Sequence, residues 1–479
     1  MTTITIAWIA LPFFLGFVIY LIPRLDRYLA LLVTFASAGY ALQLFVERSP
    51  LTLKLLDNFG VILTVDQLSG YFILTNALVT AAVILYCWHS NKTAFFYAQT
   101  IILHGSLNAA FACSDLISLY VALEVSGIAA FLLIAYPRTD RSIWVGLRYL
   151  FVSNVAMLFY LIGAVLVYQA HHSFSFGGLR QAPPEALALI FLGFLTKGGV
   201  FVSGLWLPLT HSESETPVSA MMSGIVVKAG VYPLVRCALM VEEVDPIVRI
   251  FGVGTALLGV FYAVFEKDTK RMLAFHTISQ LGFILAAPVV GGFYALTHGL
   301  VKSALFLIVG ALPSRNLKEL QHQAIATPVW IALVIASFSI SGFPLLSGFG
   351  AKVLTTKNLL PWQVIAMNLA ALGTAISFAK FIFLPHGGEA KVKSGFWAAV
   401  ILLIGGLIVA NIVYYEAYTV TNIIKPLATI GIGWLAYFVI FKRSQLKLPR
   451  VLEEFEHLIG VMSLILILLF WKGFAWLGI

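Results

Sequence analysis

The chain has 479 residues, of which 60% are hydrophobic and only 11% charged, and its formal net charge is +9. Soluble globular proteins carry about 25% charged residues, so the composition excludes disordered, fibrous and nucleic-acid-binding proteins. Three cysteines in a chain of this length exclude a small disulfide scaffold. An all-α polytopic protein embedded in the lipid bilayer remains.

A helix needs about 20 apolar residues to cross the hydrocarbon core. The stretch from Met1 to Pro23 has no basic start and no small-residue cleavage site, so we expect a first span rather than a signal peptide. About 14–16 membrane helices are predicted in all. The expected spans are residues 5–23, 27–47, 67–88, 95–112, 115–136, 143–169, 185–206, 217–241, 247–265, 272–290, 293–313, 327–357, 361–384, 395–415, 423–441 and 458–477.

Basic residues in short loops indicate the orientation, because such loops gather on the cytoplasmic side. With the amino terminus outside, the outward loops hold about half as many basic residues as the inward ones. We therefore expect both termini outside, in a bacterial cell (inner) membrane or a thylakoid membrane. The inward basic residues would be Arg24, Arg27, Arg138, Arg141, Lys267, Lys270, Arg271, Arg315, Lys318, Lys391, Lys393, Lys442, Arg443, Lys447 and Arg450.

Several ionisable side chains fall inside the apolar spans. A charge at the bilayer centre costs at least ~2.5–3.5 kcal/mol, so it usually faces the protein interior and serves a function. For Glu124 the alternative is a structural ion pair, and for the lysines it is snorkelling to the interface. The residues are Glu124, Lys197, Lys228, Lys302, which follows His298 by one helical turn, and Lys352.

Taken together, these residues indicate a proton path. Low-dielectric surroundings disfavour the charged forms of lysine and glutamate, so each group can exchange a proton at modest cost and sense its neighbour's charge. Metal or redox chemistry would need other residues: no GxGxxG follows a strand, and Cys87, Cys113 and Cys237 are scattered singly. We expect no metal, no cofactor and no catalytic redox site.

Two spans contain residues that interrupt helices. Gly198, Gly199 and Pro208 follow Lys197, and Pro344 lies in the glycine-rich run before Lys352. A simple kink is one interpretation. The other is a pair of broken helices in inverted repeats, which supplies unwound backbone next to an ion site.

Six segments carry motifs that can be compared with known families: Asp115–Glu124, Gly204–Pro208 with Thr216–Ala220, Val227–Tyr232, Asp268–Gly282, His298–Phe306 and Gly342–Lys352. In this order they resemble the proton-antiporter family that Mrp-type Na+/H+ antiporters share with the antiporter-like membrane subunits of respiratory complex I. The resemblance covers roughly residues 60–385.

The resemblance implies two inverted five-helix repeats, over residues 95–241 (helices 4–8) and 242–385 (helices 9–13). Helices 1–3 over residues 1–94 and further helices over 386–479 would flank them. It also implies that Glu124 pairs with Lys197 as a charge switch and that Lys228 sits at the channel centre. His298 and Lys302 would continue the path and Lys352 would close it.

The chain departs from the family pattern at three places. Ser212–Glu215 replaces the residues that often precede the Thr-Pro element, and Ser126–Ile128 replaces bulkier residues after Glu124. His276 stands where the family has serine or tyrosine, and we expect a core histidine with satisfied hydrogen bonds.

Three functions remain open. The first is the D-like subunit of an Mrp-type cation/proton antiporter, favoured by Lys352 and by the modest length without a long lateral helix after residue 385. The second is a proton-pumping membrane subunit of a complex I-type NADH- or ferredoxin-quinone oxidoreductase, and only there would the chain count as a translocase subunit. The third is a membrane scaffold in which buried charges are interhelical contacts.

The implied partners are other hydrophobic subunits of such an assembly, and protons with Na+ as the transported ions; no nucleic acid is expected. We see no carboxylate cluster suitable for Na+ in the sequence, so the cation is expected to use another subunit.

Overall fold

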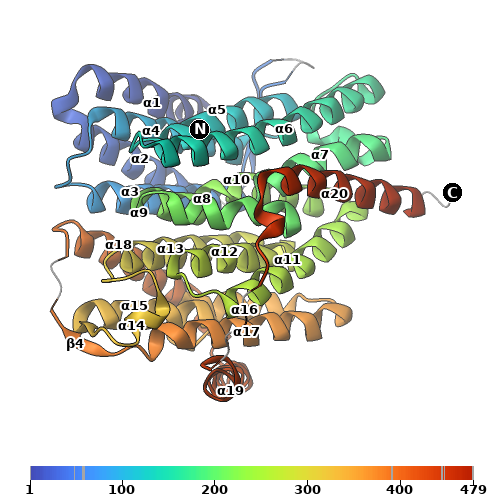
Figure 1. The fold of residues 1–479 in the computed structure, drawn as a ribbon. Coiled ribbons are helices and arrows are strands. Elements are labelled where there is room, and N and C mark those ends of the chain that lie inside the picture. The colour runs from blue at the N-terminus through green and yellow to red at the C-terminus, as the bar shows by residue number, and fades with distance from the viewer. Residues whose placement is uncertain are drawn as a thin grey trace.

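The computed structural model describes residues 2–47, 49–56, 60–389, 392–443, 446 and 448–476. Lys391 and Lys447, two of the basic residues assigned to inward loops, lie outside these residues. Almost every described element is helical (Figure 1). Two small two-stranded sheets are formed by β1 (Leu51–Lys54) with β2 (Ile62–Val65), antiparallel, and by β3 (Ile325–Ala326) with β4 (His386–Gly388), parallel. The predicted all-α membrane architecture is confirmed.

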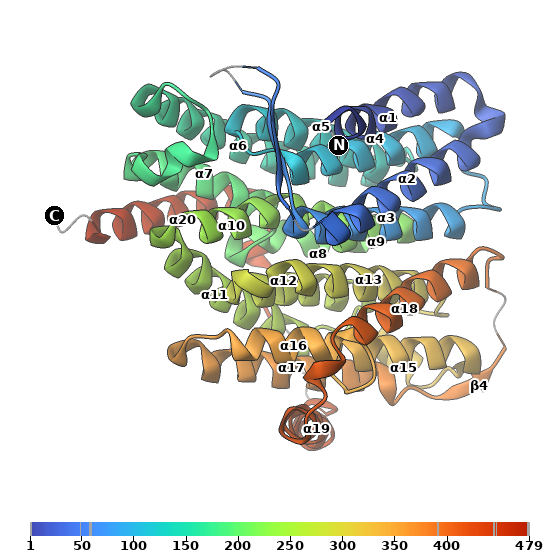
Figure 2. The same ribbon diagram turned by 180° about the vertical axis from the view of Figure 1, so that it is seen from behind.

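The helices form two stacked halves, seen from opposite sides in Figures 1 and 2. The first half contains α1 (Thr2–Leu21), α2 (Asp26–Glu47), α3 (Gln67–Tyr86), α4 (Ala94–Ala112), α5 (Leu116–Ile134), α6 (Asp140–His171), α7 (Pro184–Lys197), α8 (Leu207–Glu213), α9 (Thr216–Met221) and α10 (Lys228–Met240). The second contains α11 (Asp245–Phe265), α12 (Thr269–Ala286), α13 (Gly291–Val309), α14 (Leu317–Leu320), α15 (Thr327–Ser341), α16 (Ser347–Lys357), α17 (Val364–Ile382), α18 (Phe396–Val413) and α19 (Val420–Ala436).

Twelve stretches of the described chain are long and apolar enough to cross a membrane. The remaining predicted spans are also helical: α4, α12, the interrupted α15–α16, and α20 (Phe455–Trp476). α12 is less apolar because it is a central helix: all 18 of its residues are buried in the protein, so its serine, threonine, histidine and glutamine side chains face other helices and not lipid.

Side-chain caps fix where several helices begin. Asp66 accepts a hydrogen bond from the Ser69 N–H at 3.0 Å, and Asp115 accepts one from the Ser118 N–H at 2.7 Å. Each carboxylate satisfies an orphan donor in the first turn of its helix. Asp115 also accepts from the Ile62 N–H at 2.8 Å, which attaches β2 to the start of α5.

The first and last helices run to the same face of the molecule. Thr5, in the first turn of α1, lies 2.8 Å from the Tyr40 hydroxyl near the end of α2, which leads into β1. Towards the end of α20, Leu469 lines a cavity with Arg180 and Glu243, from the loops of the β1–β2 face. Both ends of the described chain therefore lie towards one face of the molecule.

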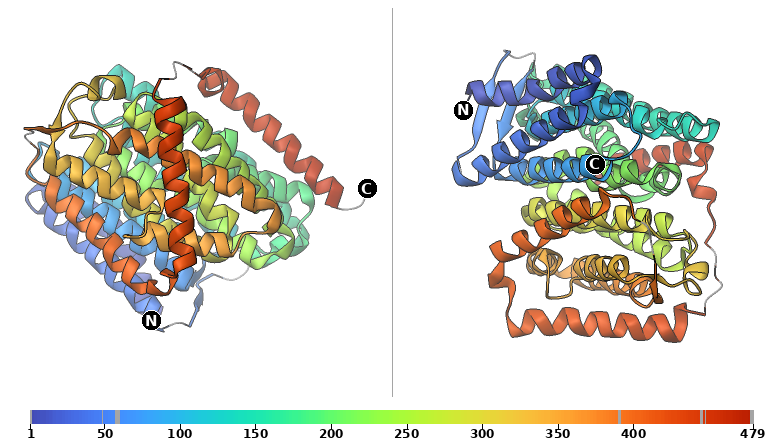
Figure 3. Two further views of the ribbon diagram at one scale, coloured as in Figure 1. Left: turned by 90° about the horizontal axis from the view of Figure 1, so that it is seen from below. Right: turned by 90° about the vertical axis from the view of Figure 1, so that its left-hand side faces the viewer.

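The last two helices depart from the packing of the others. α19, followed by a π-helical turn at Tyr437–Phe441, crosses the neighbouring helices obliquely (Figure 3). α20 then returns to the first half and packs on α7 (Figure 1). Among the described helices after residue 385 none exceeds the 22 residues of α20.

A buried ion network holds this returning segment in place. The Arg271 guanidinium, in the first turn of α12, donates to both carboxylate oxygens of Glu453 at 2.6 and 2.8 Å. The Arg148 guanidinium of α6 donates to the Glu453 carbonyl. Glu453 therefore joins one helix from each half of the molecule.

We predict that Asp66→Asn destabilises the protein at neutral pH. Asp66 caps α3 and accepts two hydrogen bonds from Arg236 of α10, at 2.5 and 2.8 Å. The expected loss is about 2–3 kcal/mol, below the full cost of breaking a buried pair because 24% of the Asp66 side chain is exposed. Thermal unfolding in detergent, with Asp140→Asn as an exposed control, measures this loss.

The pH dependence of the same pair has a defined sign. Burial by itself raises the pKa of Asp66, but the hydrogen bonds and charge of Arg236 outweigh burial and lower it. The stabilisation is thus complete above the ordinary carboxyl pKa and is lost as the pH falls through the lowered value. Acidification should shrink the stability gap between wild type and Asp66→Asn; a gap that widens towards low pH contradicts this assignment.

Candidate functional site

Lys197 is the last residue of α7, where the helix is interrupted. Gly199 has φ of +67°, a left-handed conformation that glycine adopts readily, and a 3₁₀ segment then leads to α8. A Cβ on Gly198 would lie 3.2 Å from the carbonyl carbon of Gly230, so the interruption lies directly against α10. Pro208 lies in the first turn of α8, where its missing N–H costs nothing.

The Lys197 ammonium group is buried beside α5 and α6. Its Nζ donates to the Ser153 hydroxyl at 2.7 Å, and a Cβ on Gly127 would lie 2.9 Å from it. Gly127, a departure from the family pattern, therefore leaves the space that this ammonium occupies. Glu124, one turn earlier on α5, is half-buried and its Oε1 has no hydrogen-bond partner among the described residues.

Glu124 and Lys197 are neighbours rather than a closed ion pair. Their charges interact, but no contact within 4 Å joins them in the part of the chain that the structure describes. The hydroxyl of Ser153 takes the place of a carboxylate at the ammonium. The arrangement leaves both charges free to change partners.

Lys228 begins α10 directly after an irregular stretch of helix. Residues Met222–Val226 are π-helical, a form that is rare and frequent at functional sites. The Lys228 Nζ donates to the carbonyls of Gly224 and, at 3.4 Å, Ser223 within this stretch. The side chain is completely buried, and a Cβ on Gly299 of α13 would lie 3.5 Å from its Nζ. Lys228 therefore reaches the helix that carries His298.

α13 supplies two further buried groups. Lys302 is completely buried, donates to the carbonyl of Leu273 on α12, and lies 5.2 Å from the centroid of the Phe306 ring. His298 is also buried, and neither ring nitrogen has a hydrogen-bond partner among the described residues. A buried polar group without a partner marks a place that water or a proton donor can fill.

Lys352 lies beside the second helix interruption. Gly342, with φ of +84°, follows the last residue of α15, and the next residues, including Pro344, connect to α16. The aliphatic part of Lys352 packs over Gly342, where a Cβ would lie 2.8 Å from its Cδ. Its Nζ, unpartnered within the described chain, lies 5.5 Å from the Phe283 ring centroid.

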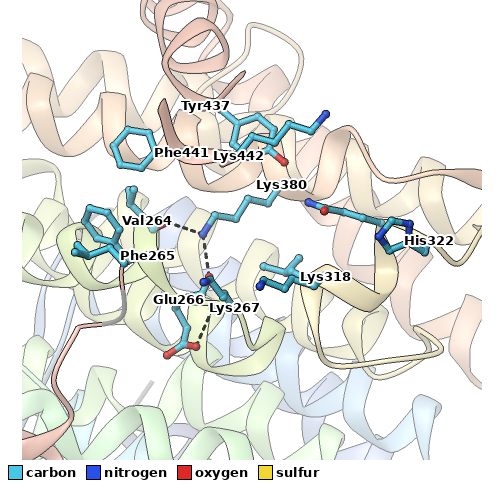
Figure 4. A pocket seen from close by; sticks show the side chains of 13 residues that line it. Val264, Phe265, Glu266, Lys267, Lys318, His322, Lys380, Tyr437, Phe441 and Lys442 are labelled. Carbon is cyan, nitrogen blue, oxygen red and sulfur yellow. Dashed lines mark hydrogen bonds between the residues drawn. The ribbon is translucent and has the colours of Figure 1, made fainter. Parts of the chain in front are cut away.

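The sequence interpretation missed further buried polar residues. His276 was expected to be satisfied, and this was wrong: it is fully buried, and its two ring nitrogens, like those of His211, find no partner in the described residues. Lys380, inside the predicted span 361–384, donates to the carbonyls of Ala263, Val264 and Glu266 at 3.2, 2.6 and 2.9 Å (Figure 4). A charge in an apolar run was the signal for Lys380; no periodicity indicated the unpaired histidines.

Metal-ligand geometry is absent from the described residues: no group of three or more His, Cys, Asp or Glu side chains converges. Cys87, Cys113 and Cys237 are buried and unpaired with one another. The chemistry that the site does offer is protonation and deprotonation of buried amines and imidazoles.

Comparison with known proteins finds a matching family and several relatives. Residues 113–377 match the family described as NADH:quinone oxidoreductase/Mrp antiporter, transmembrane. The D subunit of the Na(+)/H(+) antiporter of Alkalihalophilus pseudofirmus is 26% identical over 82% of this chain and 88% of that protein. The N subunit of the NADH-quinone oxidoreductase of Desulforudis audaxviator is 31% identical over 68% of this chain and 72% of that protein.

The fold has a counterpart among solved structures. A chain of the Mrp complex from Dietzia sp. DQ12-45-1b matches with a TM-score of 0.75 and 19% identity, over 92% of this chain and 98% of that one. The family match spans more than half of the residues and includes both helix interruptions. It also includes five of the ionisable residues described above: Glu124, Lys197, Lys228, Lys302 and Lys352. The protein belongs to the NADH:quinone oxidoreductase/Mrp antiporter transmembrane family.

Proposed function

We propose that this protein is the proton-translocating subunit of a multisubunit cation/proton antiporter, similar to the D subunit of Mrp systems. One observation carries the proposal: among the described residues, three of the buried lysines bind backbone carbonyls or a hydroxyl, and not a carboxylate. Lys228 and Lys302 donate to carbonyls and Lys197 to Ser153. Each amine can therefore release a proton without leaving an unpaired carboxylate in the membrane.

The proton route follows the helix contacts. Lys228 reaches the α13 backbone at Gly299, next to His298, and Lys302 lies one turn further on the same helix. Water at the unpartnered nitrogens of His298 would complete the connection. Lys352, beside the interruption between α15 and α16, is the next amine and would close the route towards the next subunit or the far side.

The Glu124–Lys197 pair acts as the switch. A change of charge on Lys228 alters the field at Lys197 and moves its ammonium between Ser153 and Glu124. At an effective dielectric constant of about 20, a unit charge about 7 Å away contributes ~2.4 kcal/mol, enough to change proton affinity more than tenfold.

The two flanking helix interruptions fit an inverted-repeat arrangement over residues 95–241 and 242–385, with hydrated backbone at each site.

The orientation and partners follow from the same reasoning. The loops carrying Arg138, Lys267 and Arg315 would face the cytoplasm, with both termini outside a bacterial inner membrane. Other hydrophobic subunits would cover Glu124, which is only half-buried in this chain alone. Na+ is the proposed counter-ion, by analogy with the Na(+)/H(+) antiporter relative that matches most of the chain, and it would bind on a partner subunit.

A complex I-type assembly is the second candidate. The 31% identity with the N subunit of an NADH-quinone oxidoreductase favours it, although that match covers less of both proteins than the match to the Na(+)/H(+) antiporter. The buried amines would work in the same way in either assembly. Electron transfer would then take place in partner subunits.

We predict that Lys228→Met reduces proton flux to the level of protein-free liposomes, because the completely buried amine has no substitute on α10. Glu124→Gln should abolish coupled transport in the same assay while the complex still assembles. Flux is measured with a pH-sensitive dye in proteoliposomes. Normal flux in Lys228→Met would reduce this lysine to a packing role and refute the proposed path.

Gly127→Val tests the position of the Lys197 ammonium. The new side chain needs the space 2.9 Å from the Lys197 Nζ, so it displaces the group from Ser153. Coupled transport should fall several-fold, while stability changes by less than about 1 kcal/mol because the flexible lysine tip can move. Gly405→Val is the matched control, since no atom lies within 4 Å of its Cβ position; equal losses in both variants would count against the switch.

The two assemblies are separated by what the native protein brings with it. Mild detergent extraction and mass spectrometry should recover small hydrophobic antiporter subunits. Recovery of peripheral iron–sulfur subunits instead would replace the antiporter by the complex I-type assembly, without affecting the proton path itself.

A further inference from the structure

Lys380 lines a cavity that none of the proposed steps uses. The cavity has a volume of about 200 Å3 and lies between the end of α11, the short helix α14, the end of α17 and the turn after α19 (Figure 4). Lys267, Lys318 and Lys442 also line it, on the face assigned to the cytoplasm. Water and cations from that side have access to this cavity.

The bonding of Lys380 differs from that of the other buried lysines. An ammonium has three N–H donors, and Lys380 uses them on three carbonyls at the end of α11. These carbonyls form the negative end of the helix dipole and stabilise a positive charge. Lys228 has two such acceptors, Lys302 has one, and Lys352 has none within the described chain. Lys380 therefore has more hydrogen-bond acceptors for its ammonium group than the other three lysines have.

A buried histidine whose ring nitrogens have no hydrogen-bond partner among the described residues packs against α17, the helix that carries Lys380. His276 of α12 is fully buried, and its ring packs on Phe378 of α17 at a centroid distance of 4.7 Å. The charges that act on it are those of Lys302, Lys380 and Lys352. Of these three lysines, only Lys380 is among the described residues that line the cavity. It therefore connects the cavity electrostatically with the buried amines.

We propose that Lys380 is a fixed positive charge that prevents protons and cations in the inner cavity from reaching His276 and Lys302. The inference rests on the proposed function, because only a transporter needs such insulation. A cation that approaches the histidine from the cavity must pass a permanent ammonium, which raises its free energy. Lys380 is thus a positioning residue: its charge keeps ions in the cavity away from His276 and Lys302, and it does not transfer a proton itself.

The test is passive proton leak in proteoliposomes that contain the purified complex. A K+ diffusion potential drives protons in the absence of Na+, and a trapped pH dye reports their flux. Lys380→Met and Lys380→Gln should raise the leak by about tenfold or more, because a unit charge at this range changes proton binding at a buried site by such a factor. The amide of Lys380→Gln still donates to the α11 carbonyls, which separates charge from helix capping. Lys380→Arg and the cavity-wall control Lys267→Met should remain tight.

A double variant identifies the route of the leak. His276→Phe keeps an aromatic ring against Phe378 but removes both nitrogens, so Lys380→Gln with His276→Phe should leak no more than wild type. An unchanged leak in Lys380→Gln, or loss of transport without leak, would overturn the proposal; the second result would make Lys380 a carrier. Coupled transport is measured in a separate assay with a Na+ gradient. A wild-type complex that moves no protons in that assay would refute the proposed function, whatever the leak assay shows.

Discussion

The structure depends on how it accommodates positive charge in a region that excludes water. Each buried amine must be compensated, and a permanent carboxylate partner would hold its proton too firmly for transfer. This chain compensates with backbone carbonyls, which ordinary helices use up in their own hydrogen bonds. For two of the lysines the carbonyls lie where a helix is irregular or ends: the π-helical stretch before Lys228 and the end of α11 at Lys380. Lys302 instead donates to the Leu273 carbonyl inside α12. An irregular or terminal part of a helix can thus supply the acceptors that a buried ammonium group needs.

The degree of compensation orders the amines by function. Lys352 has no acceptor in the described chain and Lys302 has one, whereas Lys380 has three. Each added carbonyl acceptor stabilises the charged form of the amine. In the proposed function the same residue type would serve as a proton carrier in the middle of the molecule and as a barrier at its edge.

The sequence was informative where local chemistry decides the outcome. The spans follow from apolar length, and the interruptions after Lys197 and before Lys352 follow from glycine and proline, whose backbone preferences are local. Lys380 gave the same signal as Lys228, a charge in an apolar run, and was overlooked. What the sequence could not provide depends on contacts between distant segments: the missing partners of His276, the hydroxyl of Ser153 at Lys197, and the oblique course of α19 all follow from tertiary packing.

The Glu453 junction bears on how the protein is made. Arg148 and Arg271 precede Glu453 by 305 and 182 residues, so both enter the membrane long before their acceptor is synthesised. Until then Arg271 can pair with Glu266, which lies five residues before it and accepts from its Nε at 3.1 Å. Arg148 has no carboxylate partner other than Glu453 near it among the described residues. Glu453 then gives both arginines an acceptor and joins a helix of each half. This contact between the two halves can therefore form only after almost all of the described chain has been synthesised.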